Sequence, residues 1–213
     1  MKQIILSDFD GTIILKDSAL YILERYGSGN WRKYDDQLLK GEISLEECLS
    51  KQFSSINVTQ ADIIHVLDGK IAFRPNFKNF VLSCEKFQIP LVIVSAGLDF
   101  VIDHFLSKID ISYPIPIISG VPKYNLKGLS FDFPKLKHKY SKNFKEDLVI
   151  QYQVKGYSVI YIGDGSGDFH AAKRADIVYA VKDSALARIC SENEISFHSF
   201  LDFASIIQYL RTP

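Results

Sequence analysis

Hydrophobic and polar residues follow two different periods along most of this chain. Several segments place apolar side chains at helical spacing, and short, continuous apolar runs lie between them. The runs with the length of buried strands are residues 4–6, 90–94, 158–162 and 177–181. The helical segments are residues 77–87, 98–109, 143–155 and 167–175. This alternation predicts an α/β fold in which helices cover both faces of a doubly wound, mostly parallel sheet.

The segment after the first strand has a different pattern. Residues 17–53 carry apolar side chains at near-helical spacing, which is broken at residues 27–29 and at Gly41. Ser44 and Thr59 are each followed by acidic residues within one turn, as is typical of helix N-caps, so a helix is predicted to begin at each. The pattern therefore predicts short helices inserted between the first strand and the rest of the sheet.

These patterns divide the chain into two parts. Residues 1–14 and 76–213 are predicted to form the α/β core, and residues 15–75 a small all-helical cap. Within the core, residues 115–133 contain short β-like runs with a turn at Lys127 and Gly128. A chain of 213 residues has the length of one domain with an insertion.

The composition narrows the classes of protein to consider. Hydrophobic residues make up 47% of the chain and charged residues 23%, which is ordinary for a globular protein. The 25 basic and 25 acidic residues cancel, so we expect neither nucleic acid nor a membrane as a partner. The sequence shows no apolar run of membrane-spanning length and no signal-peptide pattern. Together with three widely separated cysteines, this predicts a cytoplasmic protein, either a monomer or a homodimer.

The first predicted strand is followed by two acids, one residue apart. In an extended chain Asp8 and Asp10 point to the same side. Gly11 then allows a sharp turn, and Thr12 adds a hydroxyl. Two like charges at this spacing repel unless a cation lies between them or one is protonated, which indicates a Mg²⁺ site that also holds a nucleophile. The alternative is that Asp-Gly simply ends the strand, because that dipeptide is common in turns.

Two further strands are predicted to deliver polar turns to the same edge of the sheet. Ser95, Ala96 and Gly97 follow one strand, and Asp164 and Asp168 follow another. The carboxyl ends of parallel strands lie together, and ligands of such sheets bind there. Acids concentrated in this way need a cation, and oxygen-only ligands favour Mg²⁺.

The order of these motifs resembles the haloacid dehalogenase-like hydrolase superfamily, and the resemblance extends from Asp8 to Asp168. It implies a phosphatase in which Asp8 attacks a phosphoryl group to form an aspartyl-phosphate, while Asp10 acts as general acid and base. The implied ligands of Mg²⁺ are Asp8, Asp10 through its backbone carbonyl, Asp164 and Asp168. The implied phosphate-binding residues are Thr12, Ser95, Ala96, Gly97 and a lysine.

This lysine has several candidates. They are Lys135, Lys137, Lys139, Lys142 and Lys145. The family usually carries it at the start of the helix before the strand at residues 158–162, which favours Lys145 as catalytic and phosphate-binding residue, with Lys142 as the alternative. The other lysines are expected to form a solvated basic face.

The helical cap resembles the phosphoserine phosphatase branch, and residues 74–80 and 89–100 are most similar to the enol-phosphate phosphatase of methionine salvage. In this alignment Asp17 and Gln52 take the places of the glutamate and arginine that bind phosphoserine. Glutamine cannot replace the charge of arginine, so phosphoserine is not the expected substrate. An alternative lid pocket could be lined by Tyr21, Trp31, Arg32, Tyr34 and Phe53, although each could instead pack between cap helices.

The sequence therefore predicts Mg²⁺-dependent hydrolysis of a small-molecule phosphomonoester. Two alternatives remain open at this stage. Phosphotransfer to an acceptor alcohol would use the same aspartyl-phosphate. A non-catalytic, phosphate-binding regulatory protein could keep the same fold, although none of the expected site residues is missing.

Overall fold

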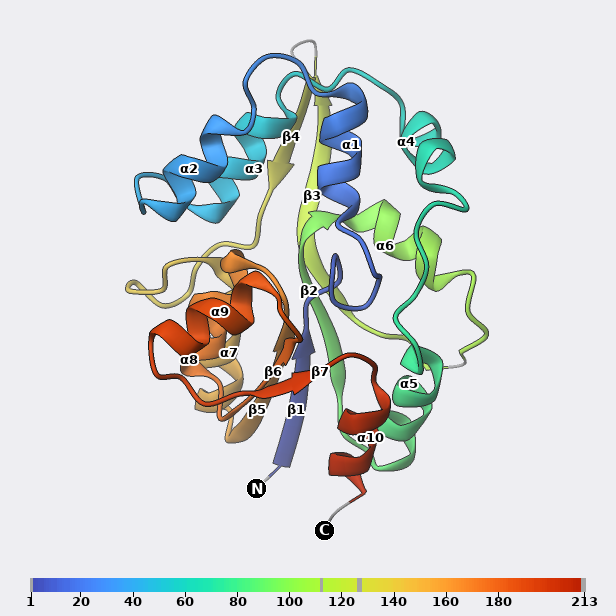
Figure 1. The fold of residues 1–213 in the computed structure, drawn as a ribbon, viewed down its shortest axis with the longest axis vertical. Coiled ribbons are helices and arrows are strands. Elements are labelled where there is room, and N and C mark those ends of the chain that lie inside the picture. Colours follow the sequence, from blue (N-terminus) through green and yellow to red (C-terminus); the bar gives the residue numbers. More distant parts are fainter. Residues whose placement is uncertain (1, 112, 126–127, 212–213) are drawn as a thin grey trace.

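A single mixed sheet forms the centre of the molecule (Figure 1). The computed structural model describes residues 2–111, 113–125 and 128–211. Within them seven strands lie in the order β4-β3-β2-β1-β5-β6-β7, and all neighbours are parallel except the antiparallel pair β3–β4. The strands are β1 (Lys2–Ser7), β2 (Leu91–Leu98), β3 (Ile117–Asn125), β4 (Gly128–Asp132), β5 (Tyr157–Gly163), β6 (Ile177–Val181) and β7 (His198–Phe200). The predicted α/β class is confirmed.

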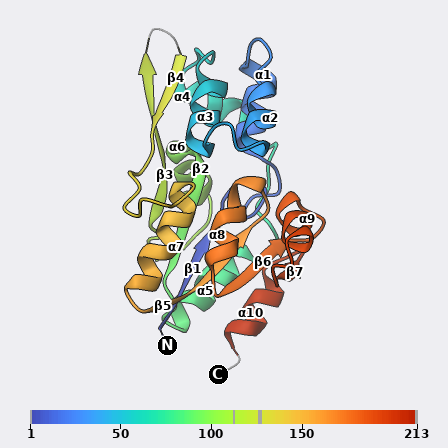
Figure 2. The same ribbon diagram turned by 90° about the vertical axis from the view of Figure 1, so that its left-hand side faces the viewer.

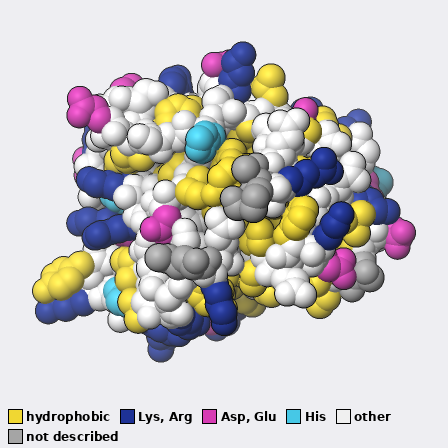
Figure 3. Space-filling view, turned by 90° about the horizontal axis from the view of Figure 1, so that it is seen from below, with side chains coloured by type: hydrophobic (Ala, Val, Ile, Leu, Met, Phe, Trp, Pro, Cys, Tyr) yellow, Lys and Arg dark blue, Asp and Glu magenta, His cyan; other side chains and the backbone are white. Residues whose placement is uncertain are grey.

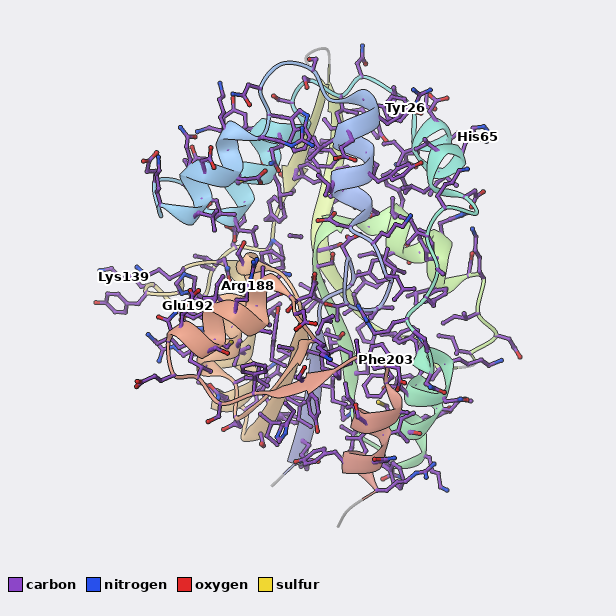
Figure 4. All side chains as sticks on the ribbon, viewed as in Figure 1. Tyr26, His65, Lys139, Arg188, Glu192 and Phe203 are labelled. Carbon is purple, nitrogen blue, oxygen red and sulfur yellow. The ribbon has the colours of Figure 1, made fainter. Side chains whose placement is uncertain are left out.

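Helices cover both faces of this sheet, because successive side chains of each strand point to opposite sides. Ile4 and Leu6 of β1 pack in one apolar cluster, and Ile5 packs in the other. The first face carries α7 (Phe144–Val154), α8 (Phe169–Arg174) and α9 (Ala185–Glu192). The second carries α5 (Phe77–Lys86), α6 (Asp99–Leu106) and α10 (Ala204–Leu210). Phe203 lies inside this second layer, where its ring stacks 4.7 Å from that of Phe80 (Figure 4).

Of the five helices between β1 and β2 in the described chain, the first four lie above the carboxyl ends of the strands (Figures 1 and 2). They are α1 (Ser18–Tyr26), α2 (Lys33–Leu39), α3 (Leu45–Phe53) and α4 (Gln60–Leu67). Ser44 and Thr59 are the N-caps of α3 and α4, as predicted, and each side chain accepts a hydrogen bond from a backbone N–H of the first turn. The exact boundaries of the cap, residues 15–75, stay a prediction.

The β3–β4 hairpin extends beyond the sheet and lies beside α3 (Figures 1 and 2). The ring of Phe131 in β4 meets that of Phe53 in α3 edge-on, with centroids 5.3 Å apart. Gly128 has φ +121°, and a Cβ there would collide with the backbone carbonyl of Ser54. Only glycine therefore allows the hairpin to approach the cap so closely. The predicted turn at Lys127 lies outside the described residues.

The structure differs from the predicted elements in three places. The second strand continues through Ser95, Ala96 and Gly97, where a turn was predicted, and its register with β3 shifts there. A 3₁₀ turn, Ser166–Asp168, precedes α8 in the segment predicted as one helix. Beyond residue 181 the sequence patterns gave no elements, whereas the structure has α9, β7 and α10.

Charged side chains are scattered over the surface that faces away from the cap. Seen from that end, Lys and Arg side chains are spread among hydrophobic and polar ones and do not gather in one patch (Figure 3). Lys139 projects from the loop before α7 into solvent (Figure 4). Among the described residues, every helix is too short or too polar to cross a membrane.

Candidate active site

The site lies where β1, β2 and β5 end side by side. Asp8 follows β1 directly, and its backbone N–H donates to the carbonyl of Ile162 in β5 (2.8 Å). Asp164 follows β5, and Ser95 lies near the end of β2. Because these strands are neighbours, the polar residues at their ends share one edge of the sheet, as the sequence predicted.

Lys145 connects two of the acids. Its Nζ donates to Asp8 Oδ1 at 2.7 Å and to Asp168 Oδ1 at 2.6 Å, and its side chain is only 4% exposed. Lys145 lies in the first turn of α7, which begins at the N-cap Asn143. Lys142, the alternative, lies outside this contact and lines a neighbouring cavity instead. Of the two candidate lysines, the structure therefore places Lys145 among the acids.

Asp168 is held on both of its oxygens. Besides Lys145, Oδ1 accepts a hydrogen bond from the hydroxyl of Tyr161 (2.7 Å). Oδ2 accepts from the backbone N–H groups of Asp164 (3.1 Å) and Gly165 (3.0 Å). The carboxylate thus fixes both the lysine and the loop that carries Asp164. Tyr161 was missed in the sequence because it occupies an apolar position of the β5 strand, although a tyrosine in such a run does call for a hydrogen-bond partner.

Thr12, which the resemblance implies as a phosphate-binding residue, contacts Asp164 in the structure. Its side chain is fully buried, and its hydroxyl donates to Asp164 Oδ1 at 2.8 Å. It is also not among the residues that line the cavity above the acids. Thr12 is therefore placed to orient Asp164, because its one hydroxyl proton already has an acceptor.

Asp10 also lines the cavity, and it contacts the start of α1. Its Oδ1 accepts a hydrogen bond from the backbone N–H of Ser18, at the start of α1 (2.7 Å). Burial, together with the nearby charge of Asp17, raises the pKa of Asp10 to about 7. A Cβ on Gly97 would lie 2.6 Å from Asp10 Oδ2, so a glycine is needed for β2 to pass this carboxylate. Ser95, Ala96 and Gly97 line the cavity, and the N–H of Gly97 donates to Ser95 Oγ (3.0 Å).

Arg74 was also missed by the sequence analysis. It is 6% exposed and donates to three backbone carbonyls: that of Gly11 at 2.5 Å, of Thr12 at 2.7 Å and of Leu201 at 3.1 Å. The guanidinium thus holds the loop between Asp10 and the cap. The adjacent proline is the only local signal for this position, and it gives no information on these three acceptors.

Negative charge predominates in the site. Burial, and after it the charge of Asp168, raises the pKa of Asp8 well above its usual range and that of Asp164 to about 7. Burial opposes the charged form of Lys145, but the carboxylates of Asp168 and Asp8 outweigh it and raise the pKa of the lysine. Carboxylate oxygens of Asp8, Asp164 and Asp168 lie within 4.8 Å of one another. This oxygen-only set suits a hard divalent cation.

A cavity of about 290 Å³ lies between these acids and the cap. Of the predicted lid residues only Trp31 lines it; Phe53 instead packs on Phe131, and Arg32 pairs with Glu24 at the surface. Tyr21, Tyr34 and Phe53 are not among its lining residues. Helical periodicity alone does not distinguish packing between helices, the alternative for each of them, from facing a cavity. Residues that line its cap end include Asp17, Leu20, Leu23, Asp35, Leu49 and Gln52.

The doubly wound core, the helical insertion and the buried cluster of acids with one lysine define a capped α/β hydrolase. Residues 5–173 match the family described as haloacid dehalogenase-like hydrolase, so the chain belongs to that family. This confirms the family resemblance seen in the motifs.

Individual relatives cover nearly the whole chain. Pdp3-interacting factor 1 of Schizosaccharomyces pombe is 31% identical in an alignment 216 residues long, which covers 96% of this chain and 93% of that protein. The 2-hydroxy-3-keto-5-methylthiopentenyl-1-phosphate phosphatase of Brevibacillus brevis is 28% identical in an alignment 215 residues long, which covers 99% of this chain and 96% of that protein. A solved phospho-aspartyl intermediate analogue of phosphoserine phosphatase shares the fold, with a TM-score of 0.70, 17% identity and 98% of each chain covered. The chain is thus a phosphatase of this hydrolase family, related to the Brevibacillus phosphatase and to phosphoserine phosphatase.

Proposed function

We propose that the protein is a Mg²⁺-dependent phosphatase that hydrolyses a small-molecule phosphomonoester through an aspartyl-phosphate on Asp8. The observation that carries the proposal is the position of Asp8, which ends β1 at the cavity floor with Lys145 bonded to one of its oxygens. The phosphatase names among the relatives support the reaction class. The small-molecule substrate and the cytoplasmic location are parts of the same proposal.

The acids of the site fit a bound Mg²⁺. Asp8, Asp164 and the backbone carbonyl of Asp10 would hold it, while Asp168, whose oxygens already accept four hydrogen bonds, would support them. A bound Mg²⁺ would offset the repulsion between the anionic nucleophile and the anionic substrate.

In the first step a carboxylate oxygen of Asp8 attacks phosphorus, and the bond between phosphorus and the ester oxygen breaks. Asp10, whose pKa of about 7 leaves it partly protonated at neutral pH, gives its proton to the departing oxygen. In the second step Asp10 takes a proton from water, which attacks the phosphorus. Inorganic phosphate leaves and Asp8 is restored. Lys145 and Ser95, with the backbone of Ala96 and Gly97, bind the phosphate oxygens.

The substitution Asp8→Asn tests the nucleophile. We expect it to abolish the turnover of a generic aryl phosphate in Mg²⁺, because the amide is a poor nucleophile of nearly the same shape. Asp110→Asn is the matched control, since the Asp110 side chain is fully exposed far from the site. Transfer of labelled phosphate to the wild-type protein, absent in Asp8→Asn, would identify the intermediate. Retained turnover in Asp8→Asn would refute the assignment.

Hydrolysis and phosphotransfer are separated by the fate of the phosphate. We expect stoichiometric release of inorganic phosphate, unchanged by added acceptor alcohols. A new phosphate ester formed at the expense of inorganic phosphate would instead indicate phosphotransfer.

A further inference from the structure

The charges on the cavity wall are divided between its two ends. Among the described residues that line it, Lys145 is the only one with a cationic side chain. Lys145 is already bonded to Asp8 and Asp168 at the cavity floor. The cap contributes two acids to the lining, Asp17 and Asp35, and no cationic side chain. Arg32 is close enough to act on Asp35, but it pairs with Glu24 and does not line the cavity. The cap side of the lining is therefore net negative.

Asp35 is held in place by a neighbouring helix. Gln52 of α3 is 4% exposed, and its Nε2 donates to Oδ1 of Asp35 in α2 at 2.8 Å. This bond connects two cap helices across the end of the cavity, while Asp35 itself keeps solvent-exposed surface. One N–H of the Gln52 amide is thus engaged by a carboxylate of the protein, and glutamine carries no charge with which to offset a carboxylate of a ligand.

The remaining lining at this end is apolar. It consists of leucine side chains, among them Leu20, Leu23 and Leu49, together with Trp31. A carboxylate or second phosphate entering here would leave bulk water and approach like charges on a wall to which the cap contributes no cationic side chain. A hydroxyl group could donate to the carboxylate of Asp35, and the carbon chain that bears it could pack on the leucines.

We infer that the cap end of the cavity selects phosphomonoesters whose organic part carries hydroxyl groups and no second anionic group, and that Asp35, held by Gln52, is the residue that makes this selection. The inference rests on the proposed function, because it concerns the organic part of the molecule whose phosphate binds at Asp8. It assigns a specificity-determining role to a pair of cap residues that lie outside the expected catalytic motifs.

Glycerol 3-phosphate and 3-phosphoglycerate form a suitable pair of probes, because a hydroxymethyl group in the first stands where the second has a carboxylate. For the wild-type protein we expect kcat/KM to be about tenfold higher for glycerol 3-phosphate, the ratio produced by one like-charge contact at partial exposure. The inhibition constant of each compound against an aryl phosphate is measured in parallel and is expected to show the same order. This second measurement gives a result even for a compound that binds without being turned over.

Two variants assign the effect to the pair. Asp35→Asn keeps the size of the side chain and is expected to bring the ratio close to one. Gln52→Arg adds a cation and is expected to favour 3-phosphoglycerate. Asp36→Asn is the control, since Asp36 lies on the same helix but does not line the cavity. Equal wild-type values for the two compounds, or an unchanged ratio in Asp35→Asn, would overturn the inference. Lack of aryl phosphatase activity in the wild-type protein would instead refute the proposed function.

Discussion

Arg74 provides a quantitative test of how the site is held together. Its guanidinium donates to the carbonyls of Gly11, Thr12 and Leu201, and thereby joins the loop after β1 to the segment between β7 and α10. The ring of Phe200 lies 5.5 Å from the guanidinium carbon. Arg74→Met keeps most of the length of the side chain but removes every donor, so three backbone carbonyls lose a charged partner.

The loss of stability can be estimated from these contacts. A hydrogen bond to a charged group contributes roughly 1.5–3 kcal/mol, and neighbouring bonds are not additive. We therefore expect Arg74→Met to lower the free energy of unfolding by about 4 kcal/mol. For a chain of this length each 1 kcal/mol corresponds to a Tm shift of roughly 2–4 °C, so Tm should fall by roughly 8–16 °C. Since the same loop carries Asp10, displacing it should also lower kcat by at least about tenfold.

Urea unfolding measures the first quantity, and aryl phosphate turnover by the folded fraction measures the second. Arg188→Met serves as the control, because Arg188 lies exposed on α9 and its replacement should change stability by less than about 0.5 kcal/mol (Figure 4). Arg74→Lys retains the charge but loses the planar fork, and should fall between wild type and Arg74→Met. If the free energy of unfolding of Arg74→Met lies within about 1 kcal/mol of the wild-type value, or if the variant keeps the wild-type kcat, the loop does not depend on the guanidinium.

Two further substitutions test single contacts. Thr12→Val removes the donor to Asp164 Oδ1 while the side chain keeps nearly the same shape. We therefore expect half-maximal activity to need a several-fold higher Mg²⁺ concentration. An unchanged Mg²⁺ requirement would contradict the orienting role of Thr12. Asp147 accepts hydrogen bonds from the backbone N–H groups of Lys137 (3.0 Å) and His138 (2.7 Å), which, against the opposing effect of burial, lower its pKa. A lowered folded-state pKa gives stability that is present above the unfolded value of about 3.9 and is lost as the pH falls through the folded one. Asp147→Asn should therefore lower the free energy of unfolding, measured with urea at pH 7, by about 1–3 kcal/mol. The difference from wild type should shrink only below a pH of about 4. A difference that does not change with pH would contradict this.

The acids at the strand ends could be predicted because two local rules are enough to place them. An apolar run followed by Asp8 indicates the end of a buried strand, and parallel strands bring their carboxyl ends together. The position of Asp164 follows from the same rules applied to β5. Short-range periodicity therefore carries this part of the site, whereas Lys145 was favoured over Lys142 by the family resemblance.

The groups that hold these acids could not be predicted in the same way. Arg74 bonds to residues more than 60 positions before it and more than 120 after it, and such contacts leave no periodic pattern. Tyr161 occupies a core position in β5, where its hydroxyl changes nothing in the apolar alternation. The same reasoning applies to the β3–β4 hairpin: the sequence indicates β-like runs, but their contact with α3 depends on the tertiary fold.

The chemistry of the site and its selectivity are thus encoded differently. Asp8 and Asp10, the groups proposed to react, lie on the core within a few residues of the end of β1, where the sequence motif indicated them. In the proposal, selectivity depends on how the cap sits over them, and that position is set by contacts between distant segments. Glu46, at the start of α3, accepts a hydrogen bond from the N–H of Phe144 at the start of α7 (2.9 Å), and the β3–β4 hairpin packs on Phe53 at the end of α3. Both contacts fix α3, which carries Gln52, and Gln52 in turn fixes Asp35. A change in the cap-to-core contacts should therefore alter the preference between organic phosphates before it alters the hydrolysis of an aryl phosphate.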